Sequence, residues 1–106
     1  MNLESDLNHK LSIICADDMY LNLEALRVVL NSLGLAEVCK FVENGKELAD
    51  CCISEAKSLE PNTELTQIII TDYEMPMKTG IEAIKEIRAF YNIQNARLQA
   101  AHRDTG

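Results

Sequence analysis

The chain has 106 residues, of which 47% are hydrophobic and 25% charged, a composition typical of a single packed domain. Its formal net charge of −7 argues against a nucleic-acid-binding surface, and its two histidines near the chain ends argue against a zinc site. The polar N-terminus and the short apolar runs predict a cytoplasmic protein without a signal peptide or a membrane-spanning helix.

The first strong pattern along the chain is the apolar run at residues 11–16. Because hydrophobic residues follow one another there without alternation, the run predicts a strand buried on both faces, as in a parallel sheet. It ends at Asp17 and Asp18, and it follows a polar lead over residues 1–10 that we expect to be flexible.

A helix, a second strand and a second helix are predicted next. Leucines at helical spacing over residues 20–33 predict a helix that ends at Gly34, and residues 37–42 predict a short strand. After the Asn44–Gly45 turn, an apolar stripe predicts a second helix that ends before Pro61. The members of that stripe are Leu48, Cys52, Ala56 and Leu59.

The strongest strand signal is Gln67–Thr71, which contains three consecutive isoleucines and ends at Asp72. We expect these isoleucines to lie in the core. Thr79 and Glu82 match a capping box that opens a third amphipathic helix. Residues 92–106 show only a weak helical pattern and no strand.

Strands and helices alternate in this order, which predicts a parallel sheet with helices on both faces. If the strand order is 2-1-3, Asp17, Asp18 and Asp72 meet beyond the carboxyl ends of neighbouring strands, where open parallel sheets bind ligands. Two such carboxylates about 4 Å apart repel by about 4 kcal/mol at an effective dielectric of about 20, so the cluster predicts a bound cation. Oxygen ligands favour Mg²⁺, and a carboxylate beside that metal can attack a phosphoryl group.

Three segments together resemble response-regulator receiver domains. Asp72–Gly80 reads D-x-x-M-P-x-x-x-G and is similar to the phosphoacceptor motif of that family. Asp17–Asn22 (D-D-x-x-x-N) resembles the acidic pair and asparagine of receivers attached to hybrid histidine kinases. Glu43–Glu47 (ENGKE) is similar to the family's turn into its second helix, and the resemblance runs from about Leu11 to Tyr91.

The resemblance implies a flavodoxin-like (CheY-like) doubly wound fold and a role as the receiver of a two-component phosphorelay. Asp72 would be the phosphoacceptor and would carry an aspartyl phosphate. The donor would be a phosphohistidine on a histidine kinase or a histidine phosphotransfer protein. Asp18 and Asp72 would bind Mg²⁺, Asp17 would assist partly through water, and the backbone carbonyl of Glu74 would be a further metal ligand.

Two parts of the family pattern have no counterpart in the sequence. A receiver's fourth strand ends in a serine or threonine that binds the phosphoryl group, and its fifth strand ends in a lysine that pairs with it. We therefore expect a partial, C-terminally truncated receiver over residues 11–91 and a divergent tail over residues 92–106. The third strand is then a sheet edge, which predicts self-association through that edge.

Two further functions stay open beside this signalling role, which would not make the chain an enzyme. The Asp72-Tyr73-Glu74 segment loosely imitates the acid-x-acid motif of Mg²⁺-dependent phosphatases with an aspartyl nucleophile. Alternatively, a truncated receiver that is not phosphorylated would act as an interaction module.

Overall fold

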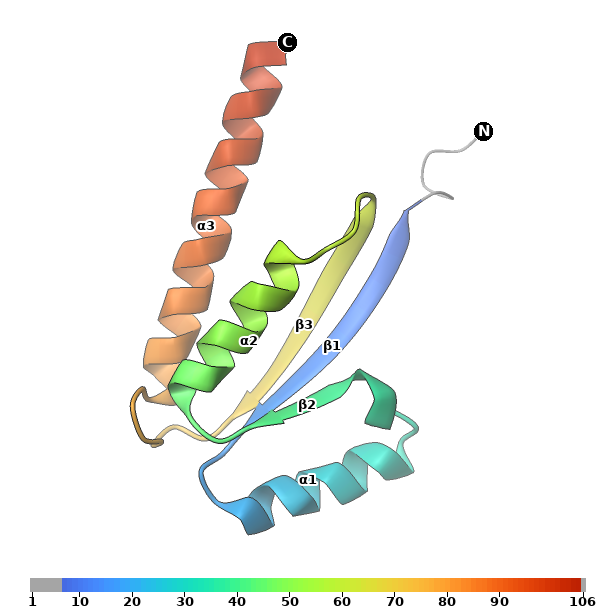
Figure 1. Ribbon diagram of the computed structural model, residues 1–106, viewed down its shortest axis with the longest axis vertical. Coiled ribbons are helices and arrows are strands. Elements are labelled where there is room, and N and C mark those ends of the chain that lie inside the picture. The colour runs from blue at the N-terminus through green and yellow to red at the C-terminus, as the bar shows by residue number, and fades with distance from the viewer. Residues whose placement is uncertain (1–6, 106) are drawn as a thin grey trace.

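The computed structural model describes residues 7–105, which form three parallel strands, three α-helices and one 3-10 turn (Figure 1). The elements are β1 (Asn8–Ala16), α1 (Tyr20–Ser32), η2 (Ala36–Val38), β2 (Cys39–Val42), α2 (Gly45–Lys57), β3 (Thr63–Thr71) and α3 (Gly80–Thr105). The strand order is β2-β1-β3, with α1 on one face of the sheet and α2 and α3 on the other. The predicted doubly wound parallel sheet of order 2-1-3 is confirmed.

β1 and β3 are longer than the sequence pattern indicates. They run parallel in continuous register from the Asn8–Thr63 pair to the Ala16–Thr71 pair. The first residues of β1 belong to this strand rather than to a flexible lead, and residues 1–6 lie outside the described range. These strand ends are polar and exposed, so hydrophobic patterning could not find them.

Two apolar layers pack against the central strand. The layer under α2 and α3 consists of Ile14, Ala16, Leu48, Ala49, Cys52, Met75, Ala83 and Ile87. The layer under α1 consists of Ile13, Cys15, Leu23 and Leu30. Because β1 contributes to both layers, its residues from Ser12 to Ala16 are all buried, which explains the uninterrupted apolar run in its sequence.

β3 is an edge strand of the described sheet, and this position exposes part of its apolar sequence. Ile68 and Ile70 point to the α1 face and are 46% and 38% exposed, so the expectation that all three isoleucines lie in the core was wrong for these two. Ile69 faces the opposite layer and packs there. Self-association through this edge stays a prediction.

α3 begins where the capping box predicted. The Glu82 amide donates to Thr79 Oγ1 at 3.1 Å, and the Thr79 amide donates to Glu82 Oε1 at 3.1 Å. The helix then continues to Thr105 without a break and extends well past α2 (Figure 1). The predicted tail from residue 92 is therefore helical as far as the structure describes it.

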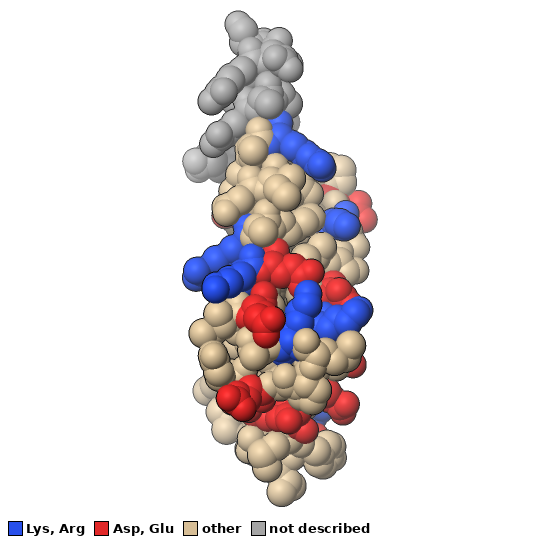
Figure 2. Space-filling view, turned by 90° about the vertical axis from the view of Figure 1, so that its left-hand side faces the viewer, with Lys and Arg blue, Asp and Glu red and all other residues tan. Residues whose placement is uncertain are grey.

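Acidic and basic side chains are interspersed on the face that includes α3, where Figure 2 shows no single large patch of either sign. Among the described residues, no helix combines the length and the apolar character that crossing a membrane requires.

Candidate functional site

The acidic site lies where β1 and β3 end side by side. The Asp72 amide donates to the Ala16 carbonyl at 2.9 Å, which places Asp72 next to the start of the β1–α1 loop. The Asp17 amide donates to the Val42 carbonyl at 3.2 Å, which ties the same loop to the end of β2. These two backbone bonds continue the strand pairing by one residue and bring distant parts of the sequence together.

Asp17, Asp18 and Asp72 form one cluster, as the sequence predicted. Each offers a carboxylate oxygen, and these oxygens all lie within 4.8 Å of one another. Asp17 is buried, whereas Asp18 and Asp72 are exposed. Two ligands on opposite sides of Mg²⁺ are about 4.2 Å apart, so this spacing suits a hydrated magnesium ion held directly by some of these oxygens and through water by the others. The donor set therefore fits Mg²⁺.

Asp17 is held firmly by its own loop. The Met19 amide donates to its Oδ1 at 2.9 Å, and Asn22 Nδ2 donates to its Oδ2 at 3.0 Å. Both carboxylate oxygens of Asp17 are therefore already hydrogen-bonded, which fixes the orientation of this side chain. Asn22 lies in the first turn of α1, from where its side chain reaches back to Asp17, which explains an asparagine at this spacing after the acidic pair.

The loop from Asp72 to Gly80 is tightly folded. The Tyr73 amide donates to Asp72 Oδ1 at 2.9 Å, and the Gly80 amide donates to the Tyr73 carbonyl at 2.8 Å. Inside the loop, the Lys78 amide donates to the Pro76 carbonyl at 2.8 Å around Met77, whose φ is 70°. A three-residue turn with positive φ is a strained conformation, so the surrounding contacts must hold it in place.

An open cavity of about 390 Å³ lies beside Asp18 and is also lined by Glu74, Met75, Pro76 and Thr79. Glu74 and Asp18 therefore border the same cavity, and a metal-binding role for the Glu74 carbonyl stays a prediction. Met75 is instead buried in the α2–α3 layer, which anchors the loop to the core.

Two residues of the Asp72–Gly80 loop, Lys78 and Gly80, make contacts that fix its position. Lys78 Nζ pairs with Glu86 of α3, so this lysine is engaged by a carboxylate outside the acidic cluster. A Cβ on Gly80 would clash with the Asp72 carbonyl and lie 3.0 Å from Thr71 Oγ1. Glycine at this position therefore allows α3 to begin close to the sheet.

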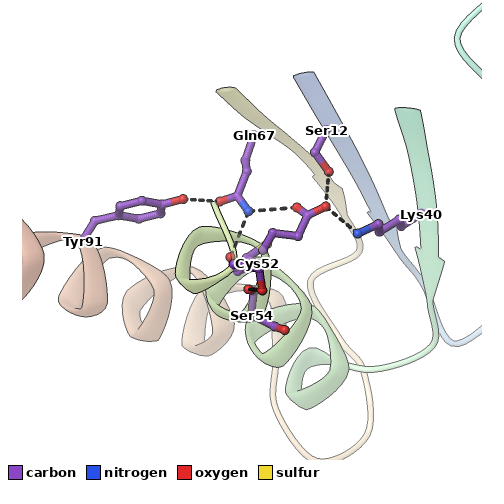
Figure 3. Close-up of polar contacts among 8 residues, drawn as sticks. Ser12, Lys40, Cys52, Ser54, Gln67 and Tyr91 are labelled. Carbon is purple, nitrogen blue, oxygen red and sulfur yellow. Dashed lines mark hydrogen bonds and ion pairs between the residues drawn. The ribbon is translucent and has the colours of Figure 1, made fainter. Parts of the chain in front are cut away.

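A second polar cluster, which sequence reasoning missed, surrounds Glu55 of α2, and Figure 3 labels its members Ser12, Lys40, Gln67 and Tyr91. Glu55 Oε2 accepts from Ser12 Oγ at 2.8 Å and from Lys40 Nζ at 2.6 Å, and Oε1 accepts from Gln67 Nε2 at 3.0 Å. Tyr91 Oη donates to Gln67 Oε1 at 2.6 Å and extends the network to α3. The network thus links all three strands to α2 and α3.

Electrostatics keep Glu55 ionised although its side chain is only 4% exposed. Burial by itself would raise its pKa, but the hydrogen bonds from Lys40, Ser12 and Gln67 outweigh burial and leave the pKa below 4.5. The same Lys40–Glu55 bond raises the pKa of Lys40. Glu55 shares the helix face of Leu48 and Cys52, and this placement of an acid in an apolar stripe was the signal available in the sequence.

A family model for the response regulator receiver domain matches residues 13–101, which is most of the chain. Two curated relatives contain a similar segment. A protein-glutamate methylesterase/protein-glutamine glutaminase of Methanococcus maripaludis is 33% identical over 81 residues, covering 76% of this chain and 20% of that protein. Chemotaxis protein CheV1 of Helicobacter pylori is 31% identical over 86 residues, covering 79% of this chain and 24% of that protein.

The chain thus spans only about a fifth to a quarter of these relatives. No solved structure gives a significant match. The strand order, the acidic cluster at the strand ends and the family match agree with one another. The chain belongs to the response regulator receiver domain family of two-component signalling.

Proposed function

We propose that the chain is a phosphorelay receiver in which Asp72 accepts a phosphoryl group from a phosphohistidine in a Mg²⁺-dependent reaction. The observation that carries this proposal is the meeting of Asp17, Asp18 and Asp72 at the ends of the strands. Clusters of acids without a cation are unfavourable, and an exposed carboxylate in such a cluster is accessible to a donor. Residues 11–91 would form the receiver part.

In the transfer step, a carboxylate oxygen of Asp72 attacks phosphorus, an O–P bond forms and the P–N bond to the donor histidine breaks. The electron pair of the broken bond stays on the imidazole nitrogen, which then takes up a proton. Because the Tyr73 amide already holds Oδ1 of Asp72 at 2.9 Å, Oδ2 is the oxygen better placed to attack. The fixed loop thus supplies orientation, which accounts for much of the catalysis in phosphoryl transfer.

Bound Mg²⁺ would offset the negative charge of the phosphoryl group beside these carboxylates. Asp18 and Asp72 would bind it directly, together with the Glu74 backbone carbonyl, while Asp17 would act partly through water. The two hydrogen bonds that Asp17 accepts from Met19 and Asn22 support this division. The cavity that Asp18 and Glu74 line offers room for the incoming group.

The donor would be a histidine kinase or a histidine phosphotransfer protein. Large apolar side chains stand exposed close to the acids: Met19 and Tyr20 follow Asp18, and Tyr73 and Met77 follow Asp72. An acidic centre with an apolar rim suits docking of a protein that presents a phosphohistidine. A cytoplasmic location is proposed because all four cysteines are free thiols, as in reducing compartments.

Incubation with acetyl phosphate and MgCl₂, followed by intact-mass measurement, tests the proposal. The wild type should gain one phosphoryl group, and Asp72→Asn should gain none. Asp50→Asn changes an exposed aspartate of α2 and should be labelled as well as the wild type. Equal labelling of Asp72→Asn would show that the acceptor is misassigned. An unlabelled wild type would favour the interaction module, whereas sustained hydrolysis of a simple phosphate ester would favour the phosphatase.

A further inference from the structure

The first residue of α2 lies directly against the backbone of the loop over residues 72–80, which is the acceptor loop of the proposed function. Gly45 is buried, and a Cβ built on it would lie 2.6 Å from the carbonyl carbon and 2.7 Å from the Cβ of Lys78. Real side chains do not approach backbone so closely, so only glycine permits this packing. Lys78 lies near the end of the loop that carries Asp72 and Glu74.

The start of α2 is itself a rigid support. The N-cap residue Asn44 accepts from the Glu47 amide through Oδ1 at 2.8 Å, and Glu47 Oε2 accepts from the amide of Glu43, the residue before the cap, at 2.9 Å. The next turn of α2 packs into the same core layer as Met75 of the acceptor loop, through Leu48 and Ala49. The loop therefore meets α2 both through its backbone and through a side chain.

These contacts limit the freedom of the acceptor loop on both sides. At its C-terminal end, Gly80 approaches the Asp72 carbonyl so closely that a Cβ would clash with it. Met77, which precedes Lys78, is held at a φ of 70° by the hydrogen bond from the Lys78 amide to the Pro76 carbonyl. A shift of Lys78 away from α2 would therefore be passed along the short loop toward Glu74 and Asp72.

We propose that Gly45 is a positioning residue for the metal site, acting through the Lys78 backbone to set where the Glu74 carbonyl and Asp72 stand relative to Asp18. The inference rests on the proposed function for its metal, but it concerns a residue in a different element. A side chain at position 45 separates α2 from the loop and widens the site. Ligand spacing that departs from what Mg²⁺ requires weakens binding, because the ion demands near-ideal geometry.

Gly45→Ala, compared with Gly34→Ala, tests this inference by calorimetric titration with MgCl₂. Gly34 has a φ of 76° and open space around its Cβ position, so alanine there strains the backbone without touching the acceptor loop. Gly45→Ala should bind Mg²⁺ about tenfold more weakly, as loss of a supporting contact around a metal typically does. Gly34→Ala should lower stability and leave the Mg²⁺ affinity unchanged. Unchanged affinity in Gly45→Ala, or equal loss in both variants, would overturn the inference.

Hydrogen exchange of the wild type gives a second test that does not depend on folding of the variant. Adding MgCl₂ should slow exchange at the first turn of α2 as well as in the acceptor loop, with no change in the last turn of α2. Protection confined to the acceptor loop would overturn the inference. If the wild type does not bind Mg²⁺ at all, the Mg²⁺ dependence in the proposed function is wrong. If wild type binds and Gly45→Ala binds equally well, only the role of Gly45 fails.

Discussion

At the carboxyl ends of the strands, Asp17, Asp18 and Asp72 bring like charges within 4.8 Å of one another, and two of the three side chains are exposed. Further along the same sheet, Glu55 is buried and faces three donors, Ser12, Lys40 and Gln67. The first cluster has an excess of acceptors, whereas the second is matched in charge and hydrogen bonding. The acidic cluster is therefore suited to binding, and the Glu55 network is suited to holding the elements together.

The largest expected loss of stability comes from removing the central carboxylate of the Glu55 network. Glu55→Ala should lower the free energy of unfolding by about 3 kcal/mol, because three donors lose their acceptor at about 1 kcal/mol each. Urea denaturation measures this change. Glu60→Ala, at an exposed position outside the helices, should change stability little. A loss as small as that of the control would show that water replaces Glu55 without penalty.

Lowering the pH should remove part of the stability that ionised Glu55 contributes. The pKa of Glu55 is lower in the folded protein than its usual 4.5, so the unfolded chain binds more protons as the pH falls. Stability from this group is therefore present above pH 4.5 and is lost as the pH drops through the folded pKa. Thermal unfolding across this range should show a flatter pH profile for Glu55→Gln than for wild type. Parallel profiles would assign acid sensitivity to other groups.

Removing a carboxylate from the acidic cluster should raise stability, whereas removing Glu55 lowers it, and binding of a cation to the cluster should also raise stability. Magnesium at ten times its dissociation constant should stabilise the wild type by about 1.4 kcal/mol. In EDTA, Asp18→Asn should be more stable than wild type by about 0.5 kcal/mol, because it removes one of the repelling charges. The same variant should gain less from MgCl₂. Thermal unfolding with and without the metal provides both values, and a loss of stability in EDTA would contradict the assumed repulsion.

A smaller change than the stabilisation by Mg²⁺ is expected from the hydrogen bond that orders Asp17. Asn22→Ala removes the donor to Asp17 Oδ2 and should cost about 0.5–1 kcal/mol in stability. Asn31→Ala, at an exposed position later in α1, provides the helix control. If the two variants change stability equally, the Asn22 bond contributes nothing beyond helix propensity.

Element order and the acidic cluster could both be predicted from the sequence for one physical reason. Parallel strands place their carboxyl ends at one edge, so acids that follow neighbouring strands must converge. Apolar runs mark buried strands, and Asp17, Asp18 and Asp72 follow two such runs directly. The fold and this part of the site needed only local patterns and topology.

Other features depended on packing that local patterns do not encode. Ile68 and Ile70 have core-like sequence, but no described element covers their face of the edge strand. The Glu55 network depends on strand register, because Ser12 lies opposite Gln67 across β1 and β3. The approach of Gly45 to Lys78 depends on how α2 packs against a loop that is distant in sequence. The Asn44–Gly45 pair predicts only a turn, and a turn does not determine that packing.

The length of α3 has a mechanical consequence. Its 26 residues make a rod about 39 Å long at about 1.5 Å per residue, and its first turn is joined to the acceptor loop. For a straight helix of that length, a tilt of about 10° at the first turn would carry the far tip sideways by about 7 Å. Small displacements near Asp72 would thus be magnified at the opposite pole of the molecule.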